Sequence, residues 1–384
     1  MAKKNGKARD ASDESAPRKD ASARGSQRGD QKQNQEQNGG MEGSPATRGG
    51  NRTAQKTTTQ YRTIQREIDQ RDQQQQKGEG GKQGGKGEQK QQAAQAGPHA
   101  EPTPPMPKQH LEKPGLESQI TPRPKYMAPE YEGSNKLRDM VAIITGGDSG
   151  IGRSVAVLYA REGADVAIIY LPVEQSDAEE TRQAVEKEGR RCLLIPGDVS
   201  NWEFCQRAVQ QTIDELGKLD ILVNNAAFQE HAESIDELTI EHFDRTMKTN
   251  LYGYFYMAKA ALPHLHQGSA IINTGSVTGL HGAKQLLDYS MTKGGIHAFT
   301  KSLSENVLDK GIRVNAVAPG PVWTPLNPAD APPDKLAKFG ADVPMGRPAQ
   351  PEELSPLYVF LAAPSCSSYI TGAVYEVIGG EHSS

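Results

Sequence analysis

The first 100 residues contain no Leu, Val, Phe or Trp, and their only aromatic and branched aliphatic residues are Tyr61, Ile64 and Ile68. So few apolar groups cannot offset an ordering entropy of roughly 1–2 kcal/mol per residue. We therefore predict a disordered, low-complexity tail over residues 1–97, rich in Gln, Gly and charged residues. Tyr61 to Asp72 has helical spacing, but a segment of about twelve residues forms only a marginal helix alone.

Cysteine is scarce as well. Cys192, Cys205 and Cys366 show neither paired nor metal-ligand spacing, which excludes a disulfide scaffold. No stretch approaches the roughly 18 apolar residues needed to cross a bilayer, and the N-terminus leads into no hydrophobic segment of a signal peptide. We expect a cytoplasmic protein without a membrane partner.

The formal charge of −4 is the sum of two unlike parts. Residues 1–130 hold 23 Lys or Arg against 16 Asp or Glu, a net of +7, and the remaining 21 against 32 leave −11 for residues 131–384. The basic part mixes both signs and has almost no aromatic residues, so we expect no nucleic-acid partner.

The part of the chain that can form a folded domain is expected to begin after the tail. Residues 98–136 are rich in proline and read as a linker or as an arm laid across a partner subunit. From residue 137 to 384 short apolar runs alternate with helix-length segments, which predicts one doubly wound, Rossmann-like α/β domain with a seven-stranded parallel sheet. The seven predicted strands are Val141–Thr145, Val166–Tyr170, Cys192–Ile195, Ile221–Val223, Ala270–Asn273, Arg313–Ala316 and Val374–Val377.

The first strand runs into a turn with four glycines, Thr145-Gly146-Gly147-Asp148-Ser149-Gly150-Ile151-Gly152. A glycine turn between a strand and a helix lets the backbone approach a pyrophosphate, and the helix N-terminus favours its charge. The spacing departs from Gly-x-Gly-x-x-Gly, and a tight turn without a ligand also fits it.

These residues resemble the short-chain dehydrogenase/reductase family, whose first turn reads Thr-Gly-x-x-x-Gly-x-Gly. Further motifs follow in family order over about residues 137–380, namely Asp198-Val199, Asn224 to Ala227, Asn250, Ser276, Tyr289 with Lys293, and Pro319-Gly320. Within this family, the sequence resembles a branch of bacterial general-stress oxidoreductases and plant glucose and ribitol dehydrogenase homologues.

Tyr289 and Lys293 stand four apart on a predicted helix and project from one face. A phenol titrates near 10, and a nearby ammonium favours the phenolate. Ser276 follows a strand at its carboxyl end, where open α/β sheets place their sites, and its hydroxyl can bond a substrate oxygen. The resemblance implies that these three residues work with Asn250, which holds a water in the proton relay.

The resemblance also implies a nicotinamide dinucleotide. Asp198 and Val199 should flank the adenine, Lys293 should bind the nicotinamide ribose, and Thr324 should lie near the carboxamide or pyrophosphate. Because no basic residue precedes Gly150 in the turn and Glu174 follows the second strand, we favour NAD over NADP. The predicted cofactor-binding residues are Thr145, Gly146, Asp148, Ser149, Gly150, Ile151, Gly152, Tyr170, Asp198, Val199, Asn225, Ala226, Ala227, Tyr289, Lys293, Pro319, Gly320, Val322 and Thr324.

For the substrate we expect a small aldehyde, ketone or polyol, with a mobile lid over Pro325 to Pro344. The predicted pocket residues are Phe228, His231, His281, Leu286 and Trp323, each of which could equally be core packing. We assign no metal, because His264 and His266 face differently on a helix and no Cys or carboxylate accompanies them. Ser276 lies in no Gly-x-Ser-x-Gly elbow, which argues against hydrolysis.

The sequence thus predicts an NAD(P)-dependent oxidoreductase acting on an alcohol or carbonyl, with Tyr289 as acid/base. The family resemblance implies a homotetramer. The alternative is a stress-protective protein whose value lies in its hydrophilic tail, joined to a domain that binds cofactor but is weakly active.

Overall fold

The computed structural model describes residues 45–78 and 93–381, with side chains from residue 51 onward in the first range and up to residue 75. Seven strands form one sheet in the order β3-β2-β1-β4-β5-β6-β7, and all six neighbouring pairs are parallel. The strands are β1 (Val141–Thr145), β2 (Asp165–Tyr170), β3 (Cys192–Pro196), β4 (Ile221–Asn224), β5 (Ala270–Thr274), β6 (Arg313–Pro319) and β7 (Val374–Val377). The predicted doubly wound sheet and its seven strands are confirmed.

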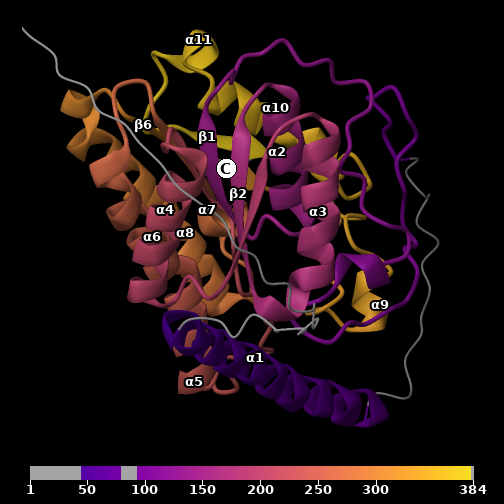
Figure 1. The fold of residues 1–384 in the computed structure, drawn as a ribbon. Helices are drawn as coiled ribbons and strands as arrows, with labels where there is room; N and C mark the ends of the chain where they lie inside the picture. Colours follow the sequence, from indigo (N-terminus) through magenta and orange to yellow (C-terminus); the bar gives the residue numbers. More distant parts are fainter. Residues whose placement is uncertain (1–44, 79–92, 382–384) are drawn as a thin grey trace, which may run out of the picture. The chain divides into compact units, whose positions relative to one another are not determined.

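Helices cover both faces of this sheet (Figure 1). The helices are α1 (Pro45–Gly78), α2 (Gly150–Arg161), α3 (Gln175–Lys187), α4 (Trp202–Leu216), α5 (Ile240–Met247), α6 (Gly253–Ala261), α7 (Thr278–His281), α8 (Leu287–Asn306), α9 (Pro333–Leu336), α10 (Pro351–Ala362) and α11 (Pro364–Ser367). Short 3₁₀ turns are η1 (Glu117–Gln119), η2 (Pro172–Glu174), η4 (Leu262–His264) and η5 (Leu308–Lys310), and η3 (Lys248–Tyr252) is a π-helical turn between α5 and α6.

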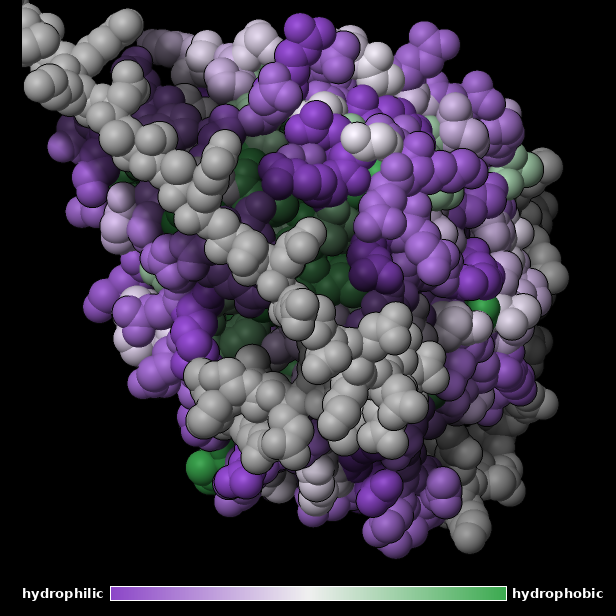
Figure 2. Space-filling model, viewed as in Figure 1, coloured by the Kyte–Doolittle hydropathy of each residue, from purple (hydrophilic) through white to green (hydrophobic). Residues whose placement is uncertain are grey.

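Alternation of side chains along β1 shows the two layers of the core on opposite faces of the sheet. Ala142 and Ile144 face α2 and α10, whereas Val141 and Ile143 face α4 and α6. The strand is buried on both sides, which explains its uninterrupted apolar sequence. On the face drawn in Figure 2 the outer surface is mainly hydrophilic, and hydrophobic residues show mostly in recesses.

The predicted tail of residues 1–97 differs from the structure in part. Residues 1–44 and 79–92 lie outside the described residues, but Pro45–Gly78 form the long helix α1, where disorder was predicted. The helix belongs to the same compact unit, Gly43–Ser384, as the sheet. Tertiary packing explains the difference, because Tyr61, Ile64 and Ile68 are all buried.

The proline-rich segment 98–136 lies against its own chain. Met106 N–H donates to the carbonyl of Ala337 at 2.8 Å, and Leu111 N–H donates to that of Pro328 at 2.8 Å. Met106 and Leu111 join a small apolar cluster around Trp323. The segment is therefore an arm on its own domain. No helix in the described ranges is long and apolar enough to span a membrane.

Candidate active site

The glycine turn after β1 has the tight geometry that its sequence predicts. Gly146 and Gly150 have φ values of +63° and +51°, a region that favours glycine. A Cβ on Gly152 would lie 1.9 Å from the carbonyl oxygen of Gly146, so only glycine fits there. The turn thus brings the N-terminus of α2 up to the carboxyl end of the sheet.

Two side chains hold this turn in place from behind. Thr145 Oγ1 accepts from the N–H groups of Asn225 at 2.8 Å and Ala226 at 3.0 Å, which ties β1 to the end of β4. Glu117 Oε2 accepts from Gly150 N–H at 2.5 Å, while its other oxygen pairs with Arg153 at 2.7 Å. Burial raises the pKa of Glu117 to about 7, although Arg153 opposes the rise.

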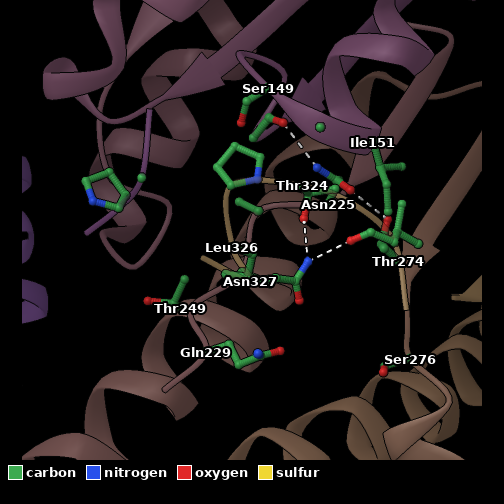
Figure 3. Close-up of a pocket in the computed structure, with 18 of the residues that line it drawn as sticks. Ser149, Ile151, Asn225, Gln229, Thr249, Thr274, Ser276, Thr324, Leu326 and Asn327 are labelled. Atoms are coloured by element: carbon green, nitrogen blue, oxygen red, sulfur yellow. Dashed lines mark hydrogen bonds between the residues drawn. The ribbon is translucent and has the colours of Figure 1, made fainter. Parts of the chain in front are cut away.

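A cavity of about 410 Å³ opens in front of the turn at the carboxyl ends of the strands. Seventeen of the nineteen predicted cofactor residues line it, whereas Thr145 and Gly152 support it from outside the lining. Figure 3 shows Ser149 at the top, Thr249 and Gln229 at lower left, and Ser276 at lower right. The lining residues among those predicted are Gly146, Asp148, Ser149, Gly150, Ile151, Tyr170, Asp198, Val199, Asn225, Ala226, Ala227, Tyr289, Lys293, Pro319, Gly320, Val322 and Thr324.

Tyr289, Lys293 and Ser276 meet in this cavity. Tyr289 and Lys293 come from α8 and are 7% and 1% exposed, and Ser276 follows β5. Lys293 Nζ lies 5.3 Å from the centre of the Tyr289 ring and donates to the carbonyl of Thr274 at 2.8 Å. The structure therefore joins three of the four predicted catalytic side chains at one place.

Burial controls the ionisation of this pair. Burial raises the pKa of the Tyr289 hydroxyl, and a hydrogen bond with Ser276 offsets part of this rise. Burial also lowers the pKa of Lys293 to about 7. The neutral form of each group is therefore favoured in the ligand-free cleft at slightly alkaline pH. A cation beside the phenol is needed to bring the tyrosine toward the working range.

Asn250 lies outside the cavity lining, on the π-helical turn η3. Its Oδ1 accepts from Phe228 N–H at 2.8 Å, and its Nδ2 donates to the carbonyl of Phe228 at 2.9 Å and to Thr292 Oγ1 at 3.1 Å. These bonds fasten the loop after β4 to α8. The residue thus supports the wall of the site, and π-turns recur at such positions.

His297 is a residue that the sequence reasoning missed. It lies one turn after Lys293 on the same face of α8, and its Nε2 accepts from Ser276 N–H at 3.4 Å. A Cβ on Gly275 would lie 2.2 Å from that nitrogen, so the ring is pressed against the loop that carries Ser276. Burial, helped by Lys293, lowers the pKa of His297 to about 4 and keeps it a neutral acceptor. The four-residue spacing after Lys293 was the available signal.

Of the five predicted substrate residues, only Leu286 lines the cavity. Phe228 stacks on Tyr61, and Trp323 is buried with its Nε1 donating to the carbonyl of Pro122 at 2.8 Å. His231 is held by carboxylates, and His281 Nδ1 lies 3.8 Å from a Glu381 oxygen. Phe228, Trp323 and His231 differ from the prediction because the arm and α1 cover them, and the sequence did not place those two elements.

Two acidic side chains line the cavity beside β2 and the glycine turn. Asp148 is buried, and its Oδ2 has no hydrogen-bond partner among the described residues. Burial raises its pKa to about 6. Burial and the Asp148 carboxylate also raise the pKa of Glu174, which bonds Leu171 N–H at 2.8 Å. An unpartnered carboxylate oxygen here suits a ribose hydroxyl donor.

Residues from far upstream also belong to the lining. Tyr61 of α1 and Pro114 and Gly115 of the arm contribute to the wall, together with Gln229 and Thr249. The sequence reasoning missed all five. Tyr61 carried a signal, as the one aromatic residue of the first 100.

Comparison with known proteins gives consistent matches. A family model described as enoyl-(acyl carrier protein) reductase matches residues 146–382. General stress protein 39 of Bacillus subtilis is 54% identical over 268 residues, covering 70% of this chain and 93% of its own. Glucose and ribitol dehydrogenase of Daucus carota is 44% identical over 280 residues, covering 71% and 96%. A solved short-chain dehydrogenase of Burkholderia cenocepacia in complex with NADP has a TM-score of 0.60 at 30% identity, covering 64% and 98%.

Proposed function

Because this chain belongs to the short-chain dehydrogenase/reductase family, we propose that it transfers a hydride between a nicotinamide dinucleotide and an alcohol or carbonyl carbon. The observation that carries the proposal is one cavity lined by the glycine turn, Tyr289, Lys293 and Ser276. The lining fits a dinucleotide, since α2 presents its N-terminus there and Asp148 offers an unpartnered oxygen.

The residues divide the chemistry as follows. When bound, the cofactor supplies the hydride donor or acceptor and, in its oxidised form, a positive charge near the phenol. Ser276 Oγ bonds the substrate oxygen, and Tyr289 Oη exchanges a proton with it. Lys293, held by the Thr274 carbonyl, donates to a ribose hydroxyl and stabilises the phenolate. Asn250 and His297 hold the loops that carry Phe228 and Ser276.

The identity of the dinucleotide is open to a direct measurement. The NAD preference predicted from the sequence is not supported by the comparisons, since the solved relative holds NADP. Lys293 is the one Lys or Arg of the described residues that lines the cavity, so a 2′-phosphate would have no second cation beside it there. Equilibrium titration with NADH and with NADPH gives the ratio of affinities.

Removal of the tyrosine hydroxyl tests the proposed reaction. Tyr289→Phe should lower kcat with small aldehydes, ketones or polyols by about 10²- to 10⁴-fold, because the proton transfer loses its partner. Binding of the reduced cofactor should stay near that of the parent protein, since the ring remains. Turnover is followed by the absorbance of reduced nicotinamide, and a variant that keeps full turnover sinks the assignment.

Two other expectations join this proposal. The alternative of a protective tail with a weakly active domain predicts little turnover of any carbonyl and protection of other proteins on drying.

We also propose a homotetramer in the cytoplasm, for which the exposed side chains of Tyr252 and Phe255 on η3 and α6 offer apolar surface. Sedimentation equilibrium measures the mass of the assembly.

A further inference from the structure

Helix α1 adds a wall to the cavity from outside the matched family region of residues 146–382. It lies beside α5 (Figure 1) and buries one face of its middle turns. The buried positions recur every three or four residues, as expected for a helix packed along one side. They are Ala54, Thr57, Thr58, Tyr61, Ile64, Gln65 and Ile68.

Thr57 fixes the helix to the carboxylate that follows β3. Its hydroxyl donates a hydrogen bond to Asp198 Oδ2, and Arg245 Nη1 lies 3.3 Å from the Thr57 oxygen. The other Asp198 oxygen accepts from Ser200 N–H at 2.9 Å. Asp198 itself lines the cavity, at the place where the family resemblance puts the adenine.

Tyr61 reaches the cavity directly. Its ring stacks on Phe228 with centroids 4.5 Å apart and planes at 24°, and its hydroxyl lies 3.0 Å from Thr249 Oγ1. The Arg245 guanidinium lies 5.8 Å above the ring. Both Tyr61 and Thr249 are lining residues, so a buried aromatic ring closes the cleft on the side of α5 and η3.

Gln65 ties the same helix to two other parts of the wall. Its Nε2 donates to the carbonyls of Leu111 at 2.8 Å and Ala329 at 3.0 Å, and its Oε1 accepts from Lys113 N–H at 2.9 Å. Neighbours of these partners, Pro114 in the arm and residues 324–327, line the cavity. Helix, arm and the segment after β6 are thus joined at one buried amide.

The cavity stays open with α1 in place. It extends from Ser149 in the glycine turn to Tyr289 while Tyr61 forms part of its side. We propose that α1 is the outer wall of the dinucleotide cleft, that Tyr61 contacts the bound cofactor on its adenosine side, and that docking of α1 through Thr57 slows cofactor release. This inference rests on the proposed function, because it names residues for the same cofactor.

The test uses the full chain and matched threonine substitutions. Thr57→Val removes the hydroxyl that bonds Asp198 at nearly constant volume. Thr63→Val is its control, because Thr63 is exposed and its hydroxyl donates to the Thr59 carbonyl of its own helix. Tyr61→Ala removes the ring, and Tyr61→Phe keeps the ring without the hydroxyl. Release of NADH and NADPH is measured by stopped-flow displacement, and affinity is measured by fluorescence titration.

We expect Thr57→Val and Tyr61→Ala to release the reduced cofactor about tenfold faster, with Kd raised by a similar factor, and Thr63→Val to match the parent. Hydrogen exchange without cofactor provides the second readout. Thr57→Val should speed exchange at the amides of residues 54–68 while β1 and β4 keep their protection, which also shows that the domain remains folded.

The other outcomes overturn the proposal in distinct ways. Release at the parent rate in both Thr57→Val and Tyr61→Ala means that α1 is no part of the cofactor site. Slower release or tighter binding means that α1 competes with the cofactor. A parent protein that binds neither NADH nor NADPH contradicts the proposed function itself, which separates that failure from a failure of α1.

Discussion

Among single residues, Lys293 makes the cleft sensitive to pH before any ligand arrives. Its ammonium is buried with the Thr274 carbonyl at 2.8 Å as its hydrogen-bond partner, and burial lowers its pKa to about 7. A cofactor ribose would give the ammonium further acceptors and raise that pKa again. Binding above neutral pH therefore takes up a proton.

Cofactor affinity should consequently be flat below pH 7 and fall as pH rises above it. The sign follows because the ligand-free lysine is neutral there and must be recharged on binding, at a cost of about tenfold in affinity per pH unit. Titrations of NADH between pH 6 and 9 measure the slope. Lys301→Met, an exposed lysine on the same helix, should keep the slope, and an unchanged slope in Lys293→Met contradicts this account.

His297 should affect turnover without affecting cofactor affinity. His297→Leu removes the acceptor for Ser276 N–H, so the serine loop loses its alignment and kcat should fall about tenfold. His297→Gln, which keeps an acceptor oxygen, should recover part of the rate. Steady-state kinetics with the cofactor varied separates the two constants, and a raised cofactor KM at constant kcat would contradict the positioning role.

Among whole elements, the strands and the glycine turn were predictable because local sequence determines them. Ile143 and Ile144 are apolar for opposite layers of the core, and Gly152 admits no Cβ. Helix α1 was not predictable as a packed element, because three of its seven buried residues are polar. From the sequence alone, Thr57 and Gln65 are expected to be exposed to solvent, because their partners lie far along the chain.

Loss of the Gln65 amide should loosen α1 and the arm together. Gln65→Ala leaves the Lys113 N–H and the Leu111 and Ala329 carbonyls without this partner, at a cost of about 1–3 kcal/mol for a buried unsatisfied group. Limited proteolysis should then cut residues 93–130 faster than in the parent. Gln70→Ala, on the exposed side of α1, serves as the control and should leave the cleavage rate unchanged.

Across the whole molecule, a buried ionic network connects four distant segments. Lys113 of the arm lies 3.0 Å from Glu230, and His231 bonds Asp330 at 2.8 Å and Asp72 of α1 at 3.1 Å. Glu230, His231 and Asp330 also have the spacing of a metal site. The Lys113 ammonium beside them disfavours a second cation. No sequence motif predicts such a network, because its residues are spread along the sequence from Asp72 to Asp330.

Because of this network, the melting temperature should fall as the pH rises above neutral. Burial opposes the charged imidazole, but hydrogen bonds to Asp330 and Asp72 outweigh it and raise the pKa of His231 to about 10. The stabilisation is complete below about pH 6.5 and is lost as pH rises toward 10, by up to about 1.4 kcal/mol per pH unit. Melting temperatures of His231→Gln should fall less steeply from pH 7 to 10 than those of the parent, while the exposed His264→Gln follows the parent.

The position of α1 also bears on the order of events during synthesis. Thr57, Tyr61 and Gln65 bond residues 141, 188 and 264 positions later in the chain. At roughly 5–20 residues per second, ribosomes need on the order of ten seconds to a minute to complete the last of these partners. Helix α1 therefore leaves the ribosome well before its partners exist, and it can complete its packing against the cleft only after the last of them has been synthesised.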